Sequence, residues 1–226
     1  MRVKAQLDVS TKPMAERALY LATKHHAGIK RKYTGEPYIN HPVRVAEILL
    51  LFGFHTEEVL SAALMHDCLE DENADGEMLE ARFVREITND RVLRWVQLLS
   101  NTETGNRKER KAKAALRIMN APIAVQAIKL ADIIDNCKGI AAHDPGFASV
   151  YLDEKWNMVN MIRRENSISD MIDTAKETIS EEMEAVALHM VATGKETQAK
   201  EVKREEVIDQ IIAEEQHSIY AEFSMF

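Results

Sequence analysis

Apolar residues recur at helical spacing along nearly the whole chain, and this periodicity restricts the fold more than any other feature. No stretch shows the apolar–polar alternation or the β-branched enrichment that is typical of a strand. Prolines stand where helices would begin, as at Pro42 and Pro122, and glycines where the chain would turn, as at Gly53 and Gly105. The sequence therefore predicts an all-α fold. Helices are expected near residues 13–27, 42–53, 57–70, 76–86, 90–100, 106–119, 122–138, 147–163, 168–192 and 196–220.

Length and composition narrow the class of protein. The 226 residues suffice for one domain with an appendage. No run of 18 apolar residues and no basic-then-apolar leader occurs, so neither a membrane span nor a secretory signal is expected. Two cysteines, Cys68 and Cys137, favour core thiols in a reducing compartment over a disulfide framework. We therefore expect a cytoplasmic protein.

The net charge of −8 is unevenly distributed along the chain. Residues 165–226 hold fifteen acidic residues against five Lys and Arg, which leaves 22 acidic and 24 basic residues in 1–164. We predict a catalytic domain over 1–164 and an acidic helical C-terminal extension over 165–226. A mildly basic domain suits a small anionic substrate, whereas the acidity of the whole chain argues against a nucleic-acid partner.

The extension carries two apolar stripes at helical spacing, one on each side of Gly194. Such stripes are typical of core packing or of a subunit interface, so we expect the extension to pack by apolar contact against the domain or to form a homo-oligomer. The stripes are Ile168, Met171, Ile172, Ile179, Met183, Val186 and Met190, and then Val207, Ile208, Ile211, Ile212 and Ile219.

Chemistry is concentrated in the segment LMHDCLED at residues 64–71. On a helix, Glu70 lies four residues after His66 and Asp71 four after Asp67, so these four side chains would share one wedge of the surface. Three acids on an otherwise apolar helix are costly to bury without a cation to coordinate or a proton to move. The alternative is a solvated acidic helix end.

Two further segments offer partners for this acidic group. In RKYTGEPYINHP at 31–42, His41 stands at the N-terminal edge of a predicted helix, and in IKLADIIDN at 128–136, Asp132 and Asn136 lie four apart on one helical face. A lone histidine or aspartate of this kind is usually structural. The ordered set His, His-Asp, Asp across about a hundred residues is much rarer, and it resembles the HD metal-dependent phosphohydrolase superfamily.

The resemblance extends to one branch of that superfamily. His26-Ala27-Gly28, followed by the segment 31–42, resembles the opening of the hydrolase domain of RelA/SpoT-type alarmone enzymes and of the small stand-alone alarmone hydrolases, and the blocks 64–71 and 129–136 match as well. The likeness covers roughly residues 12–163. It implies an HD-domain helical bundle that hydrolyses the 3′-pyrophosphate of (p)ppGpp to GDP or GTP and pyrophosphate. Because the chain is too short for the synthetase and regulatory domains of the long enzymes, we expect a stand-alone hydrolase.

By this resemblance, His41, His66, Asp67 and Asp132 would be metal ligands. Two imidazoles and two carboxylates suit a divalent first-row ion and leave positions open for water and phosphate. The family implies Mn²⁺, while ligand identity alone leaves Fe²⁺, Co²⁺ and Zn²⁺ open. Binuclear HD enzymes use additional histidines after the His-Asp pair, and none occurs over residues 68–142, so we expect one ion per chain.

Two other segments that contain histidine are assigned structural roles. His143-Asp144 is followed directly by Pro145-Gly146, so no helical partners can converge on it, and we predict a loop. His25 and His26 precede the 28–40 loop, where a packed or hydrogen-bonded role is predicted.

The remaining predicted site residues serve catalysis and substrate binding. Glu70 and Asp71 would orient and deprotonate the attacking water, with helix-end solvation as the alternative. Arg31 and Lys32 would contact a base or phosphates, although adjacent loop cations are often mere surface. Asn136 would bind a ribose or phosphate oxygen, with a helix C-cap as the alternative.

A basic cluster over residues 106–113 would meet the distal phosphates, and Arg107 is the residue chosen from it. Most of the cluster is expected to line a solvated face. One departure from the long enzymes is Ile133, which replaces a basic residue after the Ala-Asp pair and puts substrate contacts there in doubt. Tyr151 or Trp156 could supply an aromatic wall instead.

Two rival functions remain open at this point. One is hydrolysis of another nucleotide, including the 2′-phosphate of NADPH. The other is a non-catalytic nucleotide-binding regulator, which is disfavoured because every proposed ligand and both auxiliary acids are present. The expected partner is in each case a small-molecule nucleotide, without nucleic acid or membrane.

Overall fold

The computed structural model describes residues 13–193, and within them the chain is all-α, as predicted. Extended pairing in this range is limited to two isolated bridges, Lys30 with Pro37 and Glu72 with Met78. The predicted helix 196–220 lies outside the described residues. Within the described part, no helix is both long and apolar enough to cross a membrane. The helices are α1 (Met14–His25), α2 (Asn40–Leu51), α3 (Glu57–Leu64), α4 (Ala81–Ile87), α5 (Asp90–Leu99), α6 (Arg107–Met119), α7 (Ile123–Cys137), α8 (Ile140–His143), α9 (Pro145–Met161) and α10 (Ser169–Ala192).

The predicted helix 57–70 is wrong in its second half, because α3 ends at Leu64. The Nδ1 atom of His66 lies 2.8 Å from the Ala63 carbonyl oxygen, an acceptor that a continuing helix would need for its own ladder. Beyond this point the backbone tightens, and the amides of Cys68 and Glu70 donate to carbonyls three residues back. The acidic segment therefore follows a series of turns.

The predicted helix 76–86 begins five residues too early. Residues 73–77 instead form a turn in which the Asn73 side-chain oxygen accepts from the amides of Asp75 and Glu77, both at 2.9 Å. Gly76 has φ +78°, a left-handed conformation that a helix cannot contain. The asparagine–glycine turn therefore delays α4 until Ala81.

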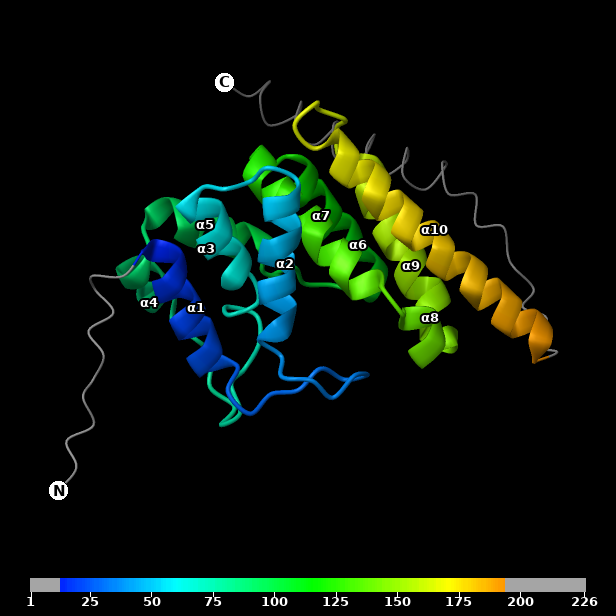
Figure 1. The fold of residues 1–226 in the computed structure, drawn as a ribbon, viewed down its shortest axis with the longest axis horizontal. Coiled ribbons are helices and arrows are strands. Elements are labelled where there is room, and N and C mark those ends of the chain that lie inside the picture. Colours follow the sequence, from blue (N-terminus) through cyan, green and yellow to red (C-terminus); the bar gives the residue numbers. More distant parts are fainter. Residues whose placement is uncertain (1–12, 194–226) are drawn as a thin grey trace.

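Helix α7 lies at the centre of the molecule, between α2 and α10 in Figure 1. It packs against α2, α3, α5, α6, α9 and α10, so apolar residues occur on all its sides and Ile128, Leu130 and Ile133 are fully buried. The burial of Ile133 explains the departure at this position, since a core side chain makes no substrate contact. Polar side chains on such a helix need partners inside the fold.

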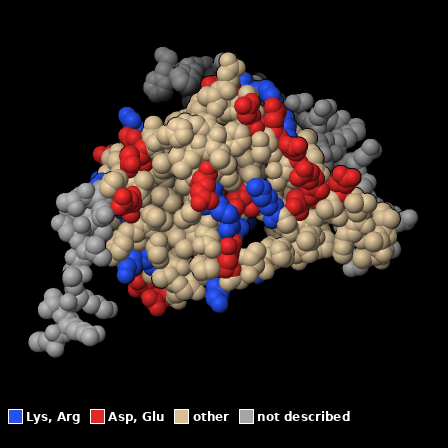
Figure 2. Space-filling view, in the orientation of Figure 1, with Lys and Arg blue, Asp and Glu red and all other residues tan. Residues whose placement is uncertain are grey.

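The apolar stripe predicted for residues 168–190 is a core stripe. Ile168, Met171, Ile172 and Ile179 are at most 2 % exposed, and α10 packs against α9 and α7. The Glu182 carboxylate also accepts from the amides of Gly139 and Ala141, at 2.6 and 2.9 Å, which holds the start of α8. In Figure 2, acidic side chains follow the edge of the molecule that α10 forms.

Candidate active site

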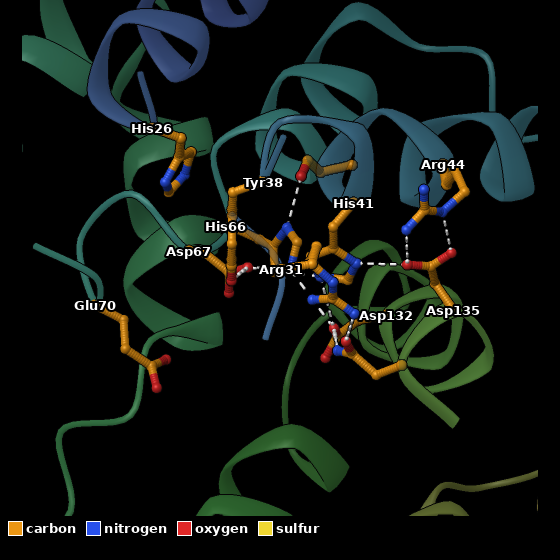
Figure 3. Close-up of polar contacts among 12 residues, drawn as sticks. His26, Arg31, Tyr38, His41, Arg44, His66, Asp67, Glu70, Asp132 and Asp135 are labelled. Atoms are coloured by element: carbon orange, nitrogen blue, oxygen red, sulfur yellow. Dashed lines mark hydrogen bonds and ion pairs between the residues drawn. The ribbon is translucent and has the colours of Figure 1, made fainter. Parts of the chain in front are cut away.

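The four predicted metal ligands come together from three elements, as Figure 3 shows. His41 lies in the first turn of α2, His66 and Asp67 in the turns after α3, and Asp132 in the middle of α7. The Nε2 atom of His41 is 3.3 Å from Asp132 Oδ1 and 3.5 Å from Asp67 Oδ2. The Nε2 atom of His66 is 3.1 Å from Asp67 Oδ2 and 3.6 Å from Asp132 Oδ1.

The hydrogen bonds of the two imidazoles determine which nitrogen faces the cluster. His66 Nδ1 lies 2.8 Å from the Ala63 carbonyl oxygen, and His41 Nδ1 lies 2.7 Å from Asp135 Oδ2. Both partners are acceptors, so each Nδ1 carries a proton and each Nε2 is free to coordinate. His66 Nε2 is buried and makes no hydrogen bond of acceptable geometry. Two such nitrogens facing two carboxylates fit a divalent cation.

The surroundings keep the two acids ionised, as ligands must be. Burial would raise the pKa of Asp132, but Lys129, whose ammonium lies 2.7 Å from Asp132 Oδ2, and the two histidines hold this pKa well below its usual value. Burial likewise opposes ionisation of Asp67, and the neighbouring His66 and His41 lower its pKa nevertheless.

A proton competes with a metal ion for His66. Burial lowers the pKa of His66, but Asp67 and Asp132 outweigh burial and hold this pKa well above its usual value. The buried Nε2 atom is therefore satisfied by a proton or by a cation. Metal affinity at this cluster must accordingly fall as the pH falls.

Three residues that the sequence reading missed support this cluster. Asp135 accepts from His41 and is held in turn by Arg44, whose Nε lies 2.6 Å from Asp135 Oδ1. Tyr38 donates its hydroxyl to Asp67 Oδ2 at 2.8 Å. Asp135 and Arg44 could have been found from the sequence, because each stands three residues after a predicted ligand and so lies on the same helical face.

Asp71 stays beside the cluster. Burial and the nearby charge of Asp67 raise the pKa of Asp71 to about 6, against an opposing hydrogen bond from the Tyr38 hydroxyl. The imidazole of His25 donates from Nε2 to the Asp71 carbonyl oxygen at 2.8 Å and so fixes its backbone. Asp71 is therefore a carboxylate able to exchange a proton near neutral pH.

Glu70 does not share a wedge with the other acids, contrary to the helical prediction. The turns that follow Leu64 direct its side chain away from the cluster in Figure 3. Its carboxylate is exposed and accepts from the backbone amide and the side-chain amide of Asn101, at 3.1 and 2.6 Å. A catalytic role for Glu70 stays a prediction.

Arg31 and Asn136 meet at the edge of the cluster. The Arg31 guanidinium donates to Asn136 Oδ1 at 2.7 Å and lies 5.7 Å from the centre of the Tyr38 ring. Asn136 also donates its amide to Asp132 Oδ1. Asp132 and Asn136 thus lie on one face of α7, as predicted. Asn136 links Asp132 of the cluster to the guanidinium of Arg31.

Lys32 lies further out and is exposed. Its ammonium is 3.1 Å from the Tyr33 hydroxyl and 3.6 Å from Asp144 Oδ2. Asp144 accepts from the amide of Phe147 at 3.2 Å and so caps α9, while His143 stacks on the Tyr33 ring. The structural role predicted for His143-Asp144 fits this arrangement, although His143 belongs to the short helix α8 and not to a loop.

Arg107 begins α6 and pairs with Glu154 of α9 through contacts of 2.6 and 3.1 Å. It lines a groove of about 350 Å³ between these two helices, with Lys108 and Lys111 among the lining residues. Of the two aromatic candidates, Tyr151 is placed near the cluster, since the Asp132 charge adds to burial in raising the pKa of Tyr151.

The remaining predictions in this region concern core residues. Cys68 and Cys137 are both free and fully buried, and burial raises the pKa of each thiol. The His26 ring packs against the Tyr38 ring in a tilted arrangement with ring centres 4.7 Å apart, and burial lowers the pKa of its imidazole to about 4. Both histidines before the loop are therefore packed or hydrogen-bonded, as predicted.

An all-helical fold that brings His, His-Asp and Asp together defines the HD class of proteins. Residues 18–155 match the HD domain family, and the chain belongs to that family. Among curated proteins it is similar to the guanosine-3′,5′-bis(diphosphate) 3′-pyrophosphohydrolase MESH1 of Xenopus tropicalis, with 33% identity over 162 residues, 68% of this chain and 86% of the relative. The human MESH1 protein is 31% identical over 128 residues, 56% of this chain and 69% of the relative.

A long bacterial enzyme and a solved structure complete the comparison. The Vibrio cholerae guanosine-3′,5′-bis(diphosphate) 3′-pyrophosphohydrolase is 35% identical over 141 residues, 60% of this chain but only 19% of the relative. A solved structure of a metazoan ortholog of SpoT that hydrolyses ppGpp superposes with a TM-score of 0.64 and covers 74% of this chain and 94% of that chain. At 24% identity, this likeness establishes the fold. The resemblance drawn from the three motifs is confirmed.

Proposed function

We propose that this protein hydrolyses the 3′-pyrophosphate of (p)ppGpp and releases pyrophosphate and GDP or GTP. The reaction is the one that the names of its MESH1 relatives specify, and 86% of one such relative is covered. The observation that carries the proposal is the convergence of two imidazole Nε2 atoms and two ionised carboxylates beside Arg31 and Asn136. The site thus offers groups for a cation and for a phosphate ester within one cluster.

We further propose that His41, His66, Asp67 and Asp132 hold one divalent ion per chain, and that this ion is Mn²⁺. When bound, such an ion neutralises charge on a phosphate oxygen and lowers the pKa of a coordinated water. Within residues 13–193, one cluster of this kind was found, formed by His41, His66 and Asp132 with ligand atoms within 4.8 Å of one another. A single cluster supports a single ion.

The chain's own residues divide the remaining tasks. Asp71 accepts the proton of the attacking water, because its pKa of about 6 leaves it ionised yet basic near neutral pH. Arg31 and Asn136 orient the ribose or phosphate oxygens beside the metal, and Lys32 and Arg107 attract the more distant phosphates. Glu70 has the lesser part in orienting this water, because its carboxylate contacts Asn101 in this structure.

The proposed setting is the cytoplasm, with a small-molecule nucleotide as partner and no nucleic acid. The domain of residues 1–164 supplies the chemistry, and the extension of residues 165–226 supports it or joins two chains. Size-exclusion chromatography with light scattering tests the homo-oligomer.

A nucleotide panel tests the activity. The Mn²⁺-loaded protein is given ppGpp, pppGpp and NADPH, and released pyrophosphate and phosphate are measured separately. We expect pyrophosphate from the first two, and none from an Asp132→Ala control that has lost its metal. Phosphate from NADPH without pyrophosphate from ppGpp would move the function to the rival hydrolase.

Elemental analysis after mild dialysis tests the metal. We expect one manganese per chain, and an Asp132→Ala variant without it. Two ions per chain, or an unchanged content in the variant, would contradict the mononuclear site.

A further inference from the structure

A small hollow of about 30 Å³ lies between α6, α7 and α9, beside the metal cluster. Since a single water needs roughly 10–15 Å³, the hollow has room for a small group of atoms. It is lined by four cationic side chains, Lys111, Arg117, Lys129 and Lys155, and by one carboxylate, Glu154. Lys129 also contacts Asp132, so one side chain links the hollow to the cluster.

Two of the four cations are neutralised within the fold. Arg117 forms an ion pair with Glu103, and Lys129 pairs with Asp132 at 2.7 Å. The Glu154 carboxylate is held by Arg107, which leaves it little charge to offer the hollow. Among the described residues, no hydrogen bond or ion pair to a side chain was found for Lys111 or Lys155.

Lys155 is the unusual member of this set. The residue is only 9 % exposed, and its ammonium lies 4.9 Å from the centre of the Tyr151 ring. Its stem is therefore largely buried, while the residue lines the hollow and no carboxylate of the described residues pairs with its ammonium. An anion that enters the hollow would give this ammonium a partner of opposite charge.

We propose that Lys155, assisted by Lys111, binds the outer phosphoryl group of the pyrophosphate that leaves the substrate. The inference rests on the proposed function and adds a specificity determinant to it. A 3′-monophosphate ester would leave the hollow unfilled, so the site would select pyrophosphate esters. Burial and the charge of Lys155 lower the pKa of Lys111, which agrees with two cations facing one small space.

Direct binding of inorganic pyrophosphate tests this subsite without any hydrolysis. Isothermal titration of the Mn²⁺-loaded protein should show that Lys155→Met raises the Kd for pyrophosphate about tenfold or more, the scale of one charge-assisted hydrogen bond. The Kd for inorganic phosphate should change less than twofold. Lys155→Arg keeps the cation and should stay within about threefold of the parent protein. An unchanged pyrophosphate Kd in Lys155→Met would overturn the proposal.

Lys176→Met is the matched control, because the Lys176 ammonium covers the Trp156 ring at 5.8 Å and does not line the hollow. It should leave pyrophosphate binding unchanged. The melting temperature separates a structural role for Lys155 from a binding role. An ammonium that pairs with no carboxylate adds little to stability, and methionine keeps the packing of the stem, so Lys155→Met should melt close to the parent. A lower melting temperature with unchanged pyrophosphate binding would make Lys155 structural.

Kinetics with two substrates complete the test. Lys155→Met should lose kcat/KM on a guanosine 3′-pyrophosphate but not on the matching 3′-monophosphate. If the effect of Lys155→Met on kcat/KM depends instead on whether the substrate carries its outer 5′-phosphate, Lys155 binds the 5′ group. That result would overturn the assignment to the leaving group. If ppGpp is not hydrolysed while pyrophosphate binding still depends on Lys155, the proposed substrate fails and the subsite stands. Hydrolysis with Lys155-independent binding refutes the subsite alone.

Discussion

Each histidine of the cluster is fixed by an acceptor on its Nδ1 side, and for His41 that acceptor is a charged one. Asp135 is 9 % exposed and receives both the imidazole and the Arg44 guanidinium. A carboxylate in this position raises the basicity of the imidazole and sets its tautomer. The affinity of the proposed site for a cation would therefore depend on a residue that is not one of the proposed ligands.

We expect Asp135→Asn to raise the Kd for Mn²⁺ by about 10- to 100-fold, the usual effect of losing such a partner. Titration calorimetry on the metal-free protein measures it. Asp173→Asn is the control, since Asp173 also pairs with an arginine, Arg164, but at an exposed position. Equal affinities in the Asp135 variant and the parent would show that the tautomer of His41 is set by other groups.

Asp71 should be the acid whose loss removes turnover without removing the metal. We expect Asp71→Asn to keep its ion and to lose kcat by roughly 10²-fold or more. In the parent protein, kcat should fall as the pH falls through about 6, because a base with this pKa is protonated below it. The variant should lack that decline.

The metal content of the same variant checks the assignment. Loss of the ion in Asp71→Asn would make Asp71 a ligand and not a base. Glu70→Gln should cost less, because its side chain contacts Asn101. An equal loss would show that Glu70 contributes as much to turnover as Asp71.

At this scale the sequence could predict which four residues come together in the cluster, but it could not predict the residues that hold them in place. His41, His66, Asp67 and Asp132 are recognisable by type and order. Tyr38 reaches Asp67 from 29 residues away, and a contact of this kind depends on how the 28–40 loop folds back. No local pattern encodes it.

At the scale of elements, a helix was predicted well where the apolar pattern and the capping side chains indicate the same ends. Helix α6 is an example, because Asn106 and Glu109 form a reciprocal capping box with both contacts at 3.0 Å. Helix α3 is the counterexample. Its apolar pattern continues past Leu64, but the His66 side chain takes a carbonyl from the ladder, and periodicity cannot anticipate that competition.

The capping box of α6 also positions the basic residues of the groove. We expect Asn106→Ala to lower the free energy of unfolding by about 1 kcal/mol, the typical value of an N-cap. Asn106→Asp keeps the acceptor and should stay within a few tenths of a kcal/mol of the parent. Urea denaturation measures both variants. Equal destabilisation in the two would mean that the amide group, and not the cap, is what stabilises the helix.

At the scale of the whole molecule, α7 joins the two ends of the described chain. It packs against α5 on one side and α10 on another, and it carries Asp132, Asp135 and Asn136. The division at residue 164 was drawn from charge, which reports the surface. Core packing crosses that position, since five side chains are at most 2 % exposed, namely Ile168, Met171, Ile172, Ala175 and Ile179. We therefore expect residues 13–193 to unfold as one unit.

Ile179→Ala tests this expectation. Ile179 is fully buried, so truncation should cost about 2–5 kcal/mol, whereas Leu188→Ala, at a side chain 64 % exposed, should change stability by less than about 0.5 kcal/mol. Trp95 on α5 and Trp156 on α9 report the two halves separately once each is made the sole tryptophan with a Trp→Phe change. If α7 couples the halves, Ile179→Ala shifts both urea transitions equally. A shift at Trp156 alone would show that α9 and α10 unfold together, apart from the helices around α5.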